Sequence, residues 1–146
     1  RDFLQKDGGS ERIASLRKEM HQVMEHSVDI FRSESGLKEA CNKIEELKDR
    51  FSSILIEDKS LIFNTELTSA LELENMIDVA ESIIFSALSR RESRGSHQRT
   101  DFVNRDDENF LRHSLAYRTE AESRIEYQDV VITKWPPAER IYGKEE

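Results

Sequence analysis

Residues 64–95 read NTELTSALELENMIDVAESIIFSALSRRESRG, and this stretch decides the fold. Its apolar residues recur at steps of three and four, but they form a stripe too wide for a helix that covers only one face of a core. Asn64 or Thr65 can cap the start of such a helix, and Gly95 after three arginines is typical of a helix end. The stretch therefore predicts a central helix that ends near Arg94.

Two amphipathic helices are predicted before this central helix. The first follows Gly8-Gly9-Ser10, where Ser10 can act as the N-cap, and the second follows a break at residues 33–36. Residues 52–62 lose the helical period and suit an extended connector. The apolar positions that define the two helices are Ile13, Leu16, Met20, Val23, Met24, Phe31, Leu37, Ala40, Cys41, Ile44, Leu47 and Phe51.

The pattern changes after Gly95. Asp106, followed by two further acids, can cap a short helix that runs through about His113. Apolar and polar residues then alternate at 115–117 and 125–127, on either side of a polar turn, and this alternation predicts a β-hairpin. Residues 130–132 are expected to extend the second strand, and Trp135-Pro136-Pro137 to force an extended exit along the surface.

We therefore expect one domain over residues 1–146, with a helical bundle in residues 1–95 and a loop, short helix, hairpin and tail in residues 96–146. The fold class is mainly α: a three-helix bundle of the spectrin-repeat-like, up-down-up kind, followed by a small β-hairpin and an extended C-terminal tail. A chain of 146 residues is long enough to bury a sizeable core without disulfides.

Composition excludes several classes of function. A formal net charge of -8 argues against general attraction to nucleic acid or to anionic lipid. Apolar runs fall short of the roughly 18 residues that a membrane span needs, and charges throughout residues 1–20 argue against a signal peptide. Cys41 is the single cysteine, which suits a reducing compartment and a small core side chain. We expect a soluble, intracellular chain and, because it starts at Arg1, a processed product or a piece of a longer protein.

Two sets of side chains have the residue types of a reactive site. The first set is Ser93, His97 and Asp101, which have the residue types of a hydrolytic triad. Four-residue spacing across a glycine does not by itself align the three side chains, so catalysis there is not expected. Two potential metal ligands lie one helical turn apart, with a third beside them: His21, Glu25 and His26. A tight metal site needs further ligands, so a solvated helix face is the favoured interpretation. The five glycines have no dinucleotide-type spacing, which argues against a phosphate-binding loop.

The strongest local charge pattern is the stretch of residues 90–105, where five arginines face only Glu92 and Asp101. Three interpretations stay open. Helix termination with pairing inside the chain is favoured, and a patch that faces a protein partner is second, because the planar guanidinium grips carboxylates and carbonyls with two hydrogen bonds. Nucleic-acid binding is third, because Phe102 is the single aromatic residue in the stretch that could stack on a base.

The same stretch also holds sequence motifs that are specific enough to indicate a family. RRESRGSHQR at 90–99, RDDENFL at 105–111 and HSL at 113–115 closely resemble the C-terminal region of the fumarate reductase and succinate dehydrogenase flavoprotein subunits. FNTEL at 63–67, RIEY at 124–127 and PPAERIY at 136–142 also resemble that family, so the likeness covers the chain broadly. The proline-rich ending with Tyr142-Gly143 is more similar to the bacterial quinol-type fumarate reductase than to the dehydrogenase.

This resemblance implies a parent enzyme that carries covalent FAD, moves a hydride between flavin and the fumarate–succinate pair, and exchanges electrons with an iron-sulfur subunit. In the family, the FAD motif, the flavin-linked histidine and the residues that hold the dicarboxylate belong to earlier domains. His113-Ser114 does not match the flavin attachment site, because Leu115 follows where the family has small residues and glycine. We therefore expect no catalytic, cofactor-binding or metal-binding residue in this chain, and FAD only in the parent.

The implied role is structural. We expect the chain to dock against the FAD-binding domain of the same polypeptide, in a complex that also holds the iron-sulfur subunit, without nucleic acid and without direct membrane insertion. The expected location is cytoplasmic, with the parent peripheral on the inner face of the bacterial cytoplasmic membrane. The alternative is a stand-alone helical protein-interaction module that binds a separate partner through the same patch. The expected docking residues are Arg90, Arg91, Glu92, Arg94, His97 and Arg99.

Overall fold

The computed structural model describes residues 4, 9–119 and 123–138. Three long helices make up its body: α2 (Ile13–Ser27), α3 (Glu34–Phe51) and α4 (Thr65–Ser89). A one-turn helix and a hairpin follow: α5 (Asp107–Phe110), β3 (Arg112–Tyr117) and β4 (Arg124–Asp129). Two short strands pair in parallel: β1 (Phe31–Arg32) and β2 (Gln98–Arg99). The predicted class, a mainly helical chain with a small β-hairpin, is confirmed.

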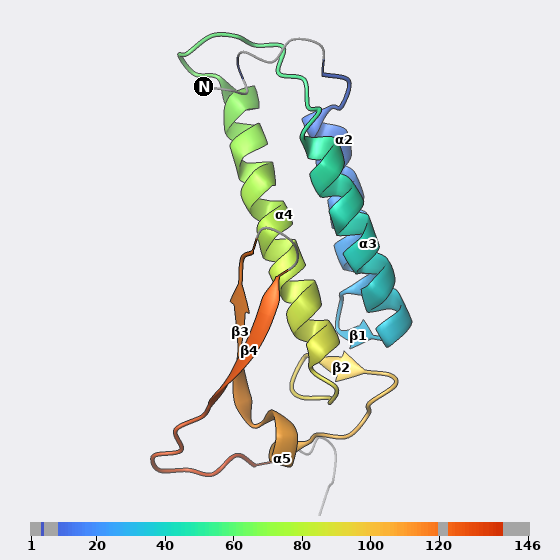
Figure 1. The fold of residues 1–146 in the computed structure, drawn as a ribbon, viewed down its shortest axis with the longest axis vertical. Coiled ribbons are helices and arrows are strands. Elements are labelled where there is room, and N and C mark those ends of the chain that lie inside the picture. The colour runs from blue at the N-terminus through green and yellow to red at the C-terminus, as the bar shows by residue number, and fades with distance from the viewer. Residues whose placement is uncertain (1–3, 5–8, 120–122, 139–146) are drawn as a thin grey trace, which may run out of the picture.

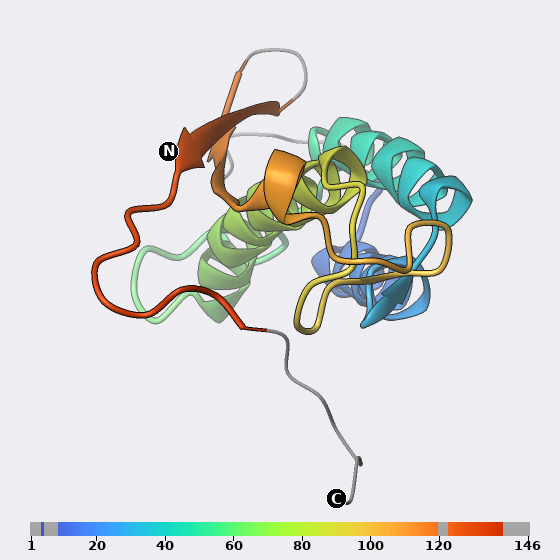
Figure 2. The same ribbon diagram turned by 90° about the horizontal axis from the view of Figure 1, so that it is seen from below.

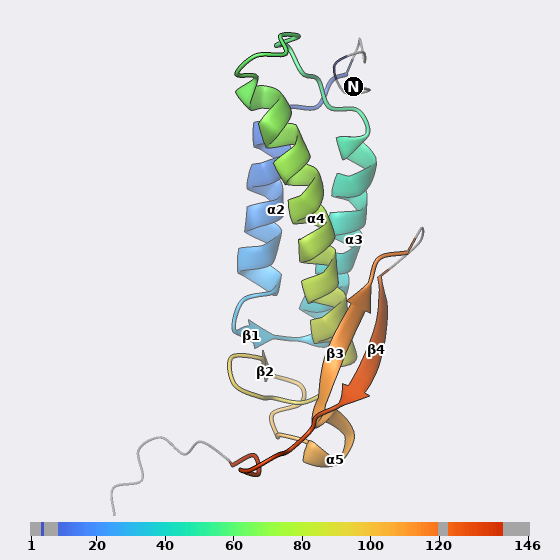
Figure 3. The same cartoon turned by 90° about the vertical axis from the view of Figure 1, so that its left-hand side faces the viewer.

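The three long helices lie side by side along the long axis of the molecule (Figure 1). A turn through β1 joins α2 to α3 at one end, and residues 52–64 cross the opposite end (Figures 1 and 3). As predicted, α4 is central, with α2 and α3 on one side of it and the hairpin on the other (Figure 2). Burial of a large aliphatic side chain contributes roughly 1.5–3 kcal/mol, so the core between the helices is the main source of stability. Its side chains are at most 9% exposed: Ile13, Leu16, Met20, Val28, Leu37, Ala40, Ile44, Leu47, Phe51, Ile54, Ile56, Ala70, Leu73, Ile77, Ala80, Ile84 and Ala87.

The helix starts follow from capping at two of three places. The Asn64 side chain accepts a hydrogen bond from the Leu67 amide, and the Ser33 hydroxyl accepts one from the Gly36 amide. Ser10 was expected to cap α2, and this prediction is wrong, because Arg12 occupies the N-cap position. The Ser10 amide instead donates to the Ser53 carbonyl, which holds this segment against the end of α3.

The end of α4 also differs from the prediction, because the helix stops at Ser89 rather than near Arg94. Arg90 adopts an extended backbone, which lets the next residues turn inward. Gly95 does have the left-handed backbone that favours glycine, at φ 58°, but it lies in a tight turn between Arg94 and His97. The glycine therefore shapes the loop after the helix and does not end the helix itself.

The hairpin was predicted correctly in place but not in its limits. Ser114 pairs with Tyr127 and Ala116 with Ile125, in antiparallel register. The short helix stops at Phe110 instead of His113, because β3 already begins at Arg112 and His113 pairs with Gln128. Residues 130–132 do not extend β4, which ends at Asp129. The predicted turn falls partly on residues 120–122, and the end of the tail on 139–146, both outside the described residues.

Several contacts fix the C-terminal part on the bundle. Hydrogen bonds join the amides of Gln98 and Thr100 to the carbonyls of Ile30 and Arg32, and so tie β2 to the turn between α2 and α3. On α4, the buried Glu81 carboxylate accepts a hydrogen bond from the Ser123 hydroxyl just before β4. Within the part of the chain that the structure describes, no helix is both long and apolar enough to cross a membrane.

Candidate functional site

The motif RRESRGSHQR and the start of RDDENFL lie in the segment after α4, residues 90–107, which contains β2 and which we call the arginine loop. At its centre is the Glu92 carboxylate, whose side chain is 0% exposed. It accepts hydrogen bonds from Arg90 Nη1 at 2.6 Å, from Arg94 Nε at 2.8 Å and Nη2 at 3.0 Å, and from the Asp106 amide at 2.8 Å. Burial opposes ionisation of Glu92, but hydrogen bonds from Arg94, the Asp106 amide and Arg90 outweigh it and hold its pKa below the ordinary value.

Arg99 is the second centre of the loop and is 1% exposed. Its Nε and Nη2 grip the two carboxylate oxygens of Asp101 at 2.7 and 2.8 Å. Its Nη1 donates to the carbonyls of Ala87, Leu88 and Arg90, which are free where α4 ends. A guanidinium at this position satisfies the helix-end carbonyls and complements the negative end of the helix dipole.

Asp101 connects this arrangement to another helix. Its Oδ2 accepts a hydrogen bond at 2.8 Å from the Glu34 amide at the start of α3. The hydrogen bonds from Arg99 hold the pKa of the Asp101 carboxyl well below its usual range, against the opposing effect of burial. The Arg99–Asp101 pair therefore ties the end of α4 to the beginning of α3.

His97 lies between two arginines. Its Nδ1 is 2.7 Å from Arg32 Nη1 and its Nε2 is 3.1 Å from the Arg90 carbonyl oxygen. Because a guanidinium can only donate, Nδ1 accepts and Nε2 carries the proton, which it donates to the carbonyl. Burial, together with the nearby arginine charges, lowers the pKa of His97 despite the hydrogen bond to that carbonyl. The neutral ring is thus a structural connector between β1 and the end of α4.

The hydrolytic-triad geometry is not formed. The Ser93 hydroxyl donates to the Phe102 carbonyl at 2.9 Å and accepts from the Arg99 amide at 2.8 Å. The bonds of His97 go to Arg32 and the Arg90 carbonyl, and those of Asp101 to Arg99 and the Glu34 amide. Each of the three side chains therefore holds loop backbone or an arginine in place.

The six expected docking residues are brought together, but most of them face inward. Glu92 and Arg99 are fully covered by this chain, and the side chains of Arg90 and Arg94 are 14% and 27% exposed. His97 is half-buried, and Arg91 is the one member of the six with an exposed side chain. Five of the six therefore use their polar groups to shape the loop, which matches the favoured interpretation of pairing inside the chain.

Sequence reasoning missed Arg32 and the aromatic support of Arg90. Arg32 donates from Nε to the carbonyls of Val28 and Asp29 at the end of α2, besides its contact with His97. The Arg90 guanidinium lies 5.7 Å from the ring centroid of Phe110 and 6.0 Å from that of Tyr127. These partners are 58, 20 and 37 residues away from Arg90 in the sequence, so no local pattern could reveal them.

The candidate metal ligands do not converge. His21, Glu25 and His26 are all exposed on α2. Among the residues described, no group of three or more histidine, cysteine, aspartate or glutamate side chains is arranged to hold a metal ion. Cys41 is partly buried and packs against the core, which fits its expected role as a small core side chain.

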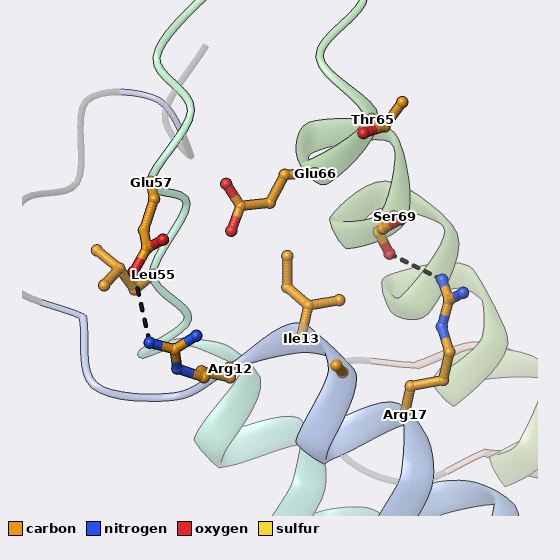
Figure 4. A pocket seen from close by; sticks show the side chains of 9 residues that line it. Arg12, Ile13, Arg17, Leu55, Glu57, Thr65, Glu66 and Ser69 are labelled. Atoms are coloured by element: carbon orange, nitrogen blue, oxygen red, sulfur yellow. Dashed lines mark hydrogen bonds and ion pairs between the residues drawn. The ribbon is translucent and has the colours of Figure 1, made fainter.

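A cavity of about 330 Å³ lies at the other end of the bundle, between the start of α2, residues 55–57 and the start of α4 (Figure 4). Each of its charged side chains has a partner within the chain. Arg12 pairs with Glu57 at 3.6 Å, Arg17 donates to the Ser69 carbonyl at 3.2 Å, and Glu66 accepts from the Asp58 amide at 2.9 Å. These contacts tie the start of α2 and residues 57–58 to the first turns of α4 or to one another and close this end of the bundle.

Comparisons with known proteins support the family resemblance that the motifs of the arginine loop indicate. Residues 17–142 match the family model described as fumarate reductase flavoprotein C-term. The chain is 50% identical over 137 residues to the fumarate reductase flavoprotein subunit of Mycobacterium tuberculosis, and 44% identical over 148 residues to that of Escherichia coli. It is 35% identical to the succinate dehydrogenase flavoprotein subunit of Rickettsia bellii. These matches include 93–99% of this chain, but the chain spans only about a quarter of the length of each relative.

Solved structures show the same relationship in three dimensions. A chain of Escherichia coli quinol fumarate reductase superimposes on 99% of this chain with a TM-score of 0.92 and 42% identity, and the match covers 25% of that chain. A quinol-fumarate reductase with menaquinol molecules gives a TM-score of 0.88 and 43% identity, over 94% of this chain and 24% of the other. Sequence and structure together show that the chain belongs to the fumarate reductase flavoprotein C-terminal family, as the C-terminal domain of a fumarate reductase or succinate dehydrogenase flavoprotein subunit.

Proposed function

We propose that this chain is a non-catalytic structural domain, and that its parent subunit interconverts fumarate and succinate. One observation carries the proposal. Three polar side chains of the arginine loop are hydrogen-bonded within the chain: Glu92, Arg99 and Asp101. Together they fix the end of α4 against α3. A side chain held in this way maintains a shape and is not poised to transfer a proton or a hydride.

We infer that FAD is bound by the other parts of the parent subunit. The residues of this chain do not fit a dinucleotide, because its glycines lie at 8, 9, 36, 95 and 143, without the spacing of a phosphate-binding loop. His113 faces solvent from β3, where it pairs with Gln128 in the hairpin ladder. The proposed partners are the FAD-binding domain of the same polypeptide and an iron-sulfur subunit that exchanges electrons with the flavin. The proposed location is cytoplasmic, with the complex peripheral on the inner face of the membrane.

We also propose the finer description of the fold, a spectrin-like bundle in which α2, α3 and α4 alternate in direction. The connections at opposite ends of the molecule support it (Figure 1). This arrangement suits a structural domain, because antiparallel neighbours bury a continuous core with short connections. Docking by the six loop residues is then mostly indirect: five of them hold the loop, and Arg91 faces outward.

The test is to purify this chain by itself and to follow its absorption spectrum, its fumarate reduction with a chemical electron donor, and its unfolding by heat. We expect no flavin absorption, no turnover and a single cooperative transition, because the apolar core lies within the chain. A yellow preparation that reduces fumarate contradicts the proposal. A stand-alone interaction module predicts instead that the chain is made as a separate polypeptide, which the reading frame upstream of Arg1 decides.

A further inference from the structure

Beside the arginine loop lies a shallow cavity of about 410 Å³ whose lining is cationic at one end and apolar at the other. It opens between α4, the β1–β2 pair and the start of β3. The charged lining residues are Arg32 and Arg90, and the polar ones are the neutral His97 ring and Ser82, Ser86 and Ser114. None of its nine lining residues is an acid. The cavity therefore presents an arginine charge without a carboxylate of its own.

The charges around the cavity are unequally compensated. Arg90 is neutralised by Glu92, at 2.6 Å. Arg32 donates hydrogen bonds to the carbonyls of Val28 and Asp29 and to the His97 ring, which are all neutral groups. The Asp29 carboxylate acts on Arg32 through its charge, but is not among the groups to which Arg32 is hydrogen-bonded. Two acids of α4 lie next to lining residues in the sequence, and both have partners: Glu81 pairs with Lys48 at 2.9 Å, and Asp78 pairs with Arg118 at 2.7 Å. A carboxylate from outside would therefore find a guanidinium hydrogen-bonded to neutral groups, together with the Ser114 hydroxyl, which accepts from Arg90 and can still donate.

An apolar groove continues from this cavity. It is lined by Met20, Met24, Asn75, Met76, Val79, Ala80 and Ile83, and it shares Val79 and Ile83 with the cationic cavity. Val79 is 58% exposed and Ile83 is 43% exposed, although both lie in the middle of the central helix. Because they share these two residues, the two depressions form one surface along α4. Figure 3 shows the helix itself, with α2 on one side of it and the hairpin on the other. An apolar patch of this kind, next to a charged group, marks a protein contact.

We propose that this surface of α4 is where the remainder of the parent subunit docks, and that an acidic side chain of that remainder enters the cavity beside Arg32 while apolar residues cover Val79 and Ile83. The proposal rests on the structural role proposed above. Three quarters of the length of the relatives lies outside the matched region, so in these subunits a large partner is covalently available. Charge complementarity selects an acidic segment of it, because the cavity supplies cations and hydroxyls but no carboxylate.

The test measures how fast a thiol placed on this surface reacts. Val79→Cys is made in a Cys41→Ser background, both in this chain alone and in the intact subunit, and iodoacetamide labelling is followed by peptide mass spectrometry. Asn42→Cys, on the exposed face of α3, is the matched control. We expect labelling at position 79 to be about tenfold or more slower in the intact subunit, because the interface excludes the reagent, and labelling at position 42 to be unchanged.

The charge requirement is tested in the same assay with Ser82→Glu and Ser82→Lys, which are similar in length and opposite in sign. We expect Ser82→Glu to restore fast labelling at position 79, because it places a carboxylate opposite the incoming one, and Ser82→Lys to retain protection. Equal loss in both variants, or no loss in either, overturns the carboxylate assignment.

The outcomes separate this inference from the proposed function. Protection at position 42 with none at position 79 means that the domain docks through another face, so the inference fails while the structural role stands. Equal labelling of the isolated chain and the intact subunit at both positions means that neither face is covered, so the inference fails. The proposed function is contradicted by a different result, flavin absorption and fumarate reduction in the isolated chain.

Discussion

The helical bundle and the arginine loop are held together by different physics. In the bundle, side chains such as Leu37, Leu73 and Ile84 are 0% exposed and touch other apolar groups. In the loop, the two side chains covered most completely are Glu92 and Arg99, which are charged, and the buried Ser93 is polar. Apolar burial is graded, since each methylene removed costs a similar amount, whereas a covered charge is stable only with its partners in place.

This difference teaches that the two regions should fail in different ways. A smaller side chain in the bundle leaves a cavity that its neighbours partly fill, so the structure remains but is weaker. Loss of one charge in the loop leaves its partners buried and uncompensated, and the segment around them must open to water. The loop is therefore predicted to be the more brittle region, although it contains fewer residues.

The largest effect is expected from Glu92→Ala. It leaves Arg90 and Arg94 without their shared carboxylate, and loss of one partner of a buried ion pair costs about 3–5 kcal/mol. Urea unfolding followed by circular dichroism measures the change. Glu92→Gln, which keeps the shape without the charge, is expected to fall between this variant and the wild type. A loss below about 1 kcal/mol would show that the loop charges are compensated by water, and the contrast between the regions would disappear.

In the bundle, Ile84→Ala is expected to cost about 3 kcal/mol, because it removes an apolar side chain that is 0% exposed in the middle of the core. The same urea experiment applies, and Ile83→Ala is the control, since Ile83 is 43% exposed on the same helix. The helix content should stay unchanged at zero urea. If the two variants were equally destabilised, burial would not be the cause.

A cap substitution at the far end of α4 is expected to have a smaller effect. Asn64→Ala removes the hydrogen bond to the Leu67 amide and those donated to the carbonyls of Asp58 and Ser60, and loss of a cap costs about 1–2 kcal/mol. Asn64→Asp keeps the acceptor for the helix amide but loses the donor, so it should recover part of the loss. The change in the thermal midpoint measures both variants.

A pH dependence is expected from His97, whose pKa is lowered by burial from its ordinary value of 6.5. Between the lowered pKa and 6.5, the unfolded chain binds a proton that the folded chain does not. The free energy of unfolding therefore falls as the pH decreases through this window. Above pH 6.5 the neutral His97 makes its full contribution to stability. His97→Gln should flatten the profile of urea midpoint against pH in this range. The same change at the exposed His21 should leave the slope intact, and a slope that persisted in the His97 variant would exclude this group as its source.

The smallest effect is expected for a surface ion pair. Lys43 lies 2.7 Å from Glu46, with side chains 52% and 47% exposed, and water screens such a pair. Lys43→Met should leave the urea midpoint within experimental error of the wild type. This variant sharpens the comparison, because the Lys43–Glu46 distance is close to the Glu92–Arg94 distance while the Lys43–Glu46 pair is far more exposed to solvent.

Much of the fold was available in the sequence. The three helices, the central position of α4, the cap at Asn64 and the place of the hairpin follow from apolar periodicity and capping chemistry, which are local. Two of the misplaced boundaries involve partners outside the local pattern. Ser10 does not cap α2 because its amide binds Ser53, and α4 stops early because Glu92 turns inward to Arg94 and Asp106. The parallel pairing of β1 with β2 joins residues 67 apart, so no local signal predicted it.

The candidate site shows the same division. The sequence alone indicated the family from motifs in residues 90–107, because these motifs are unusual and lie close together. It favoured pairing inside the chain but left an outward, partner-facing patch open, since charge and spacing are the same in both. Only the tertiary structure decided between them, by bringing Arg32, Phe110 and Tyr127 around the loop. A buried charge is stable only when every partner is present, and those partners come from parts of the chain that meet only after folding.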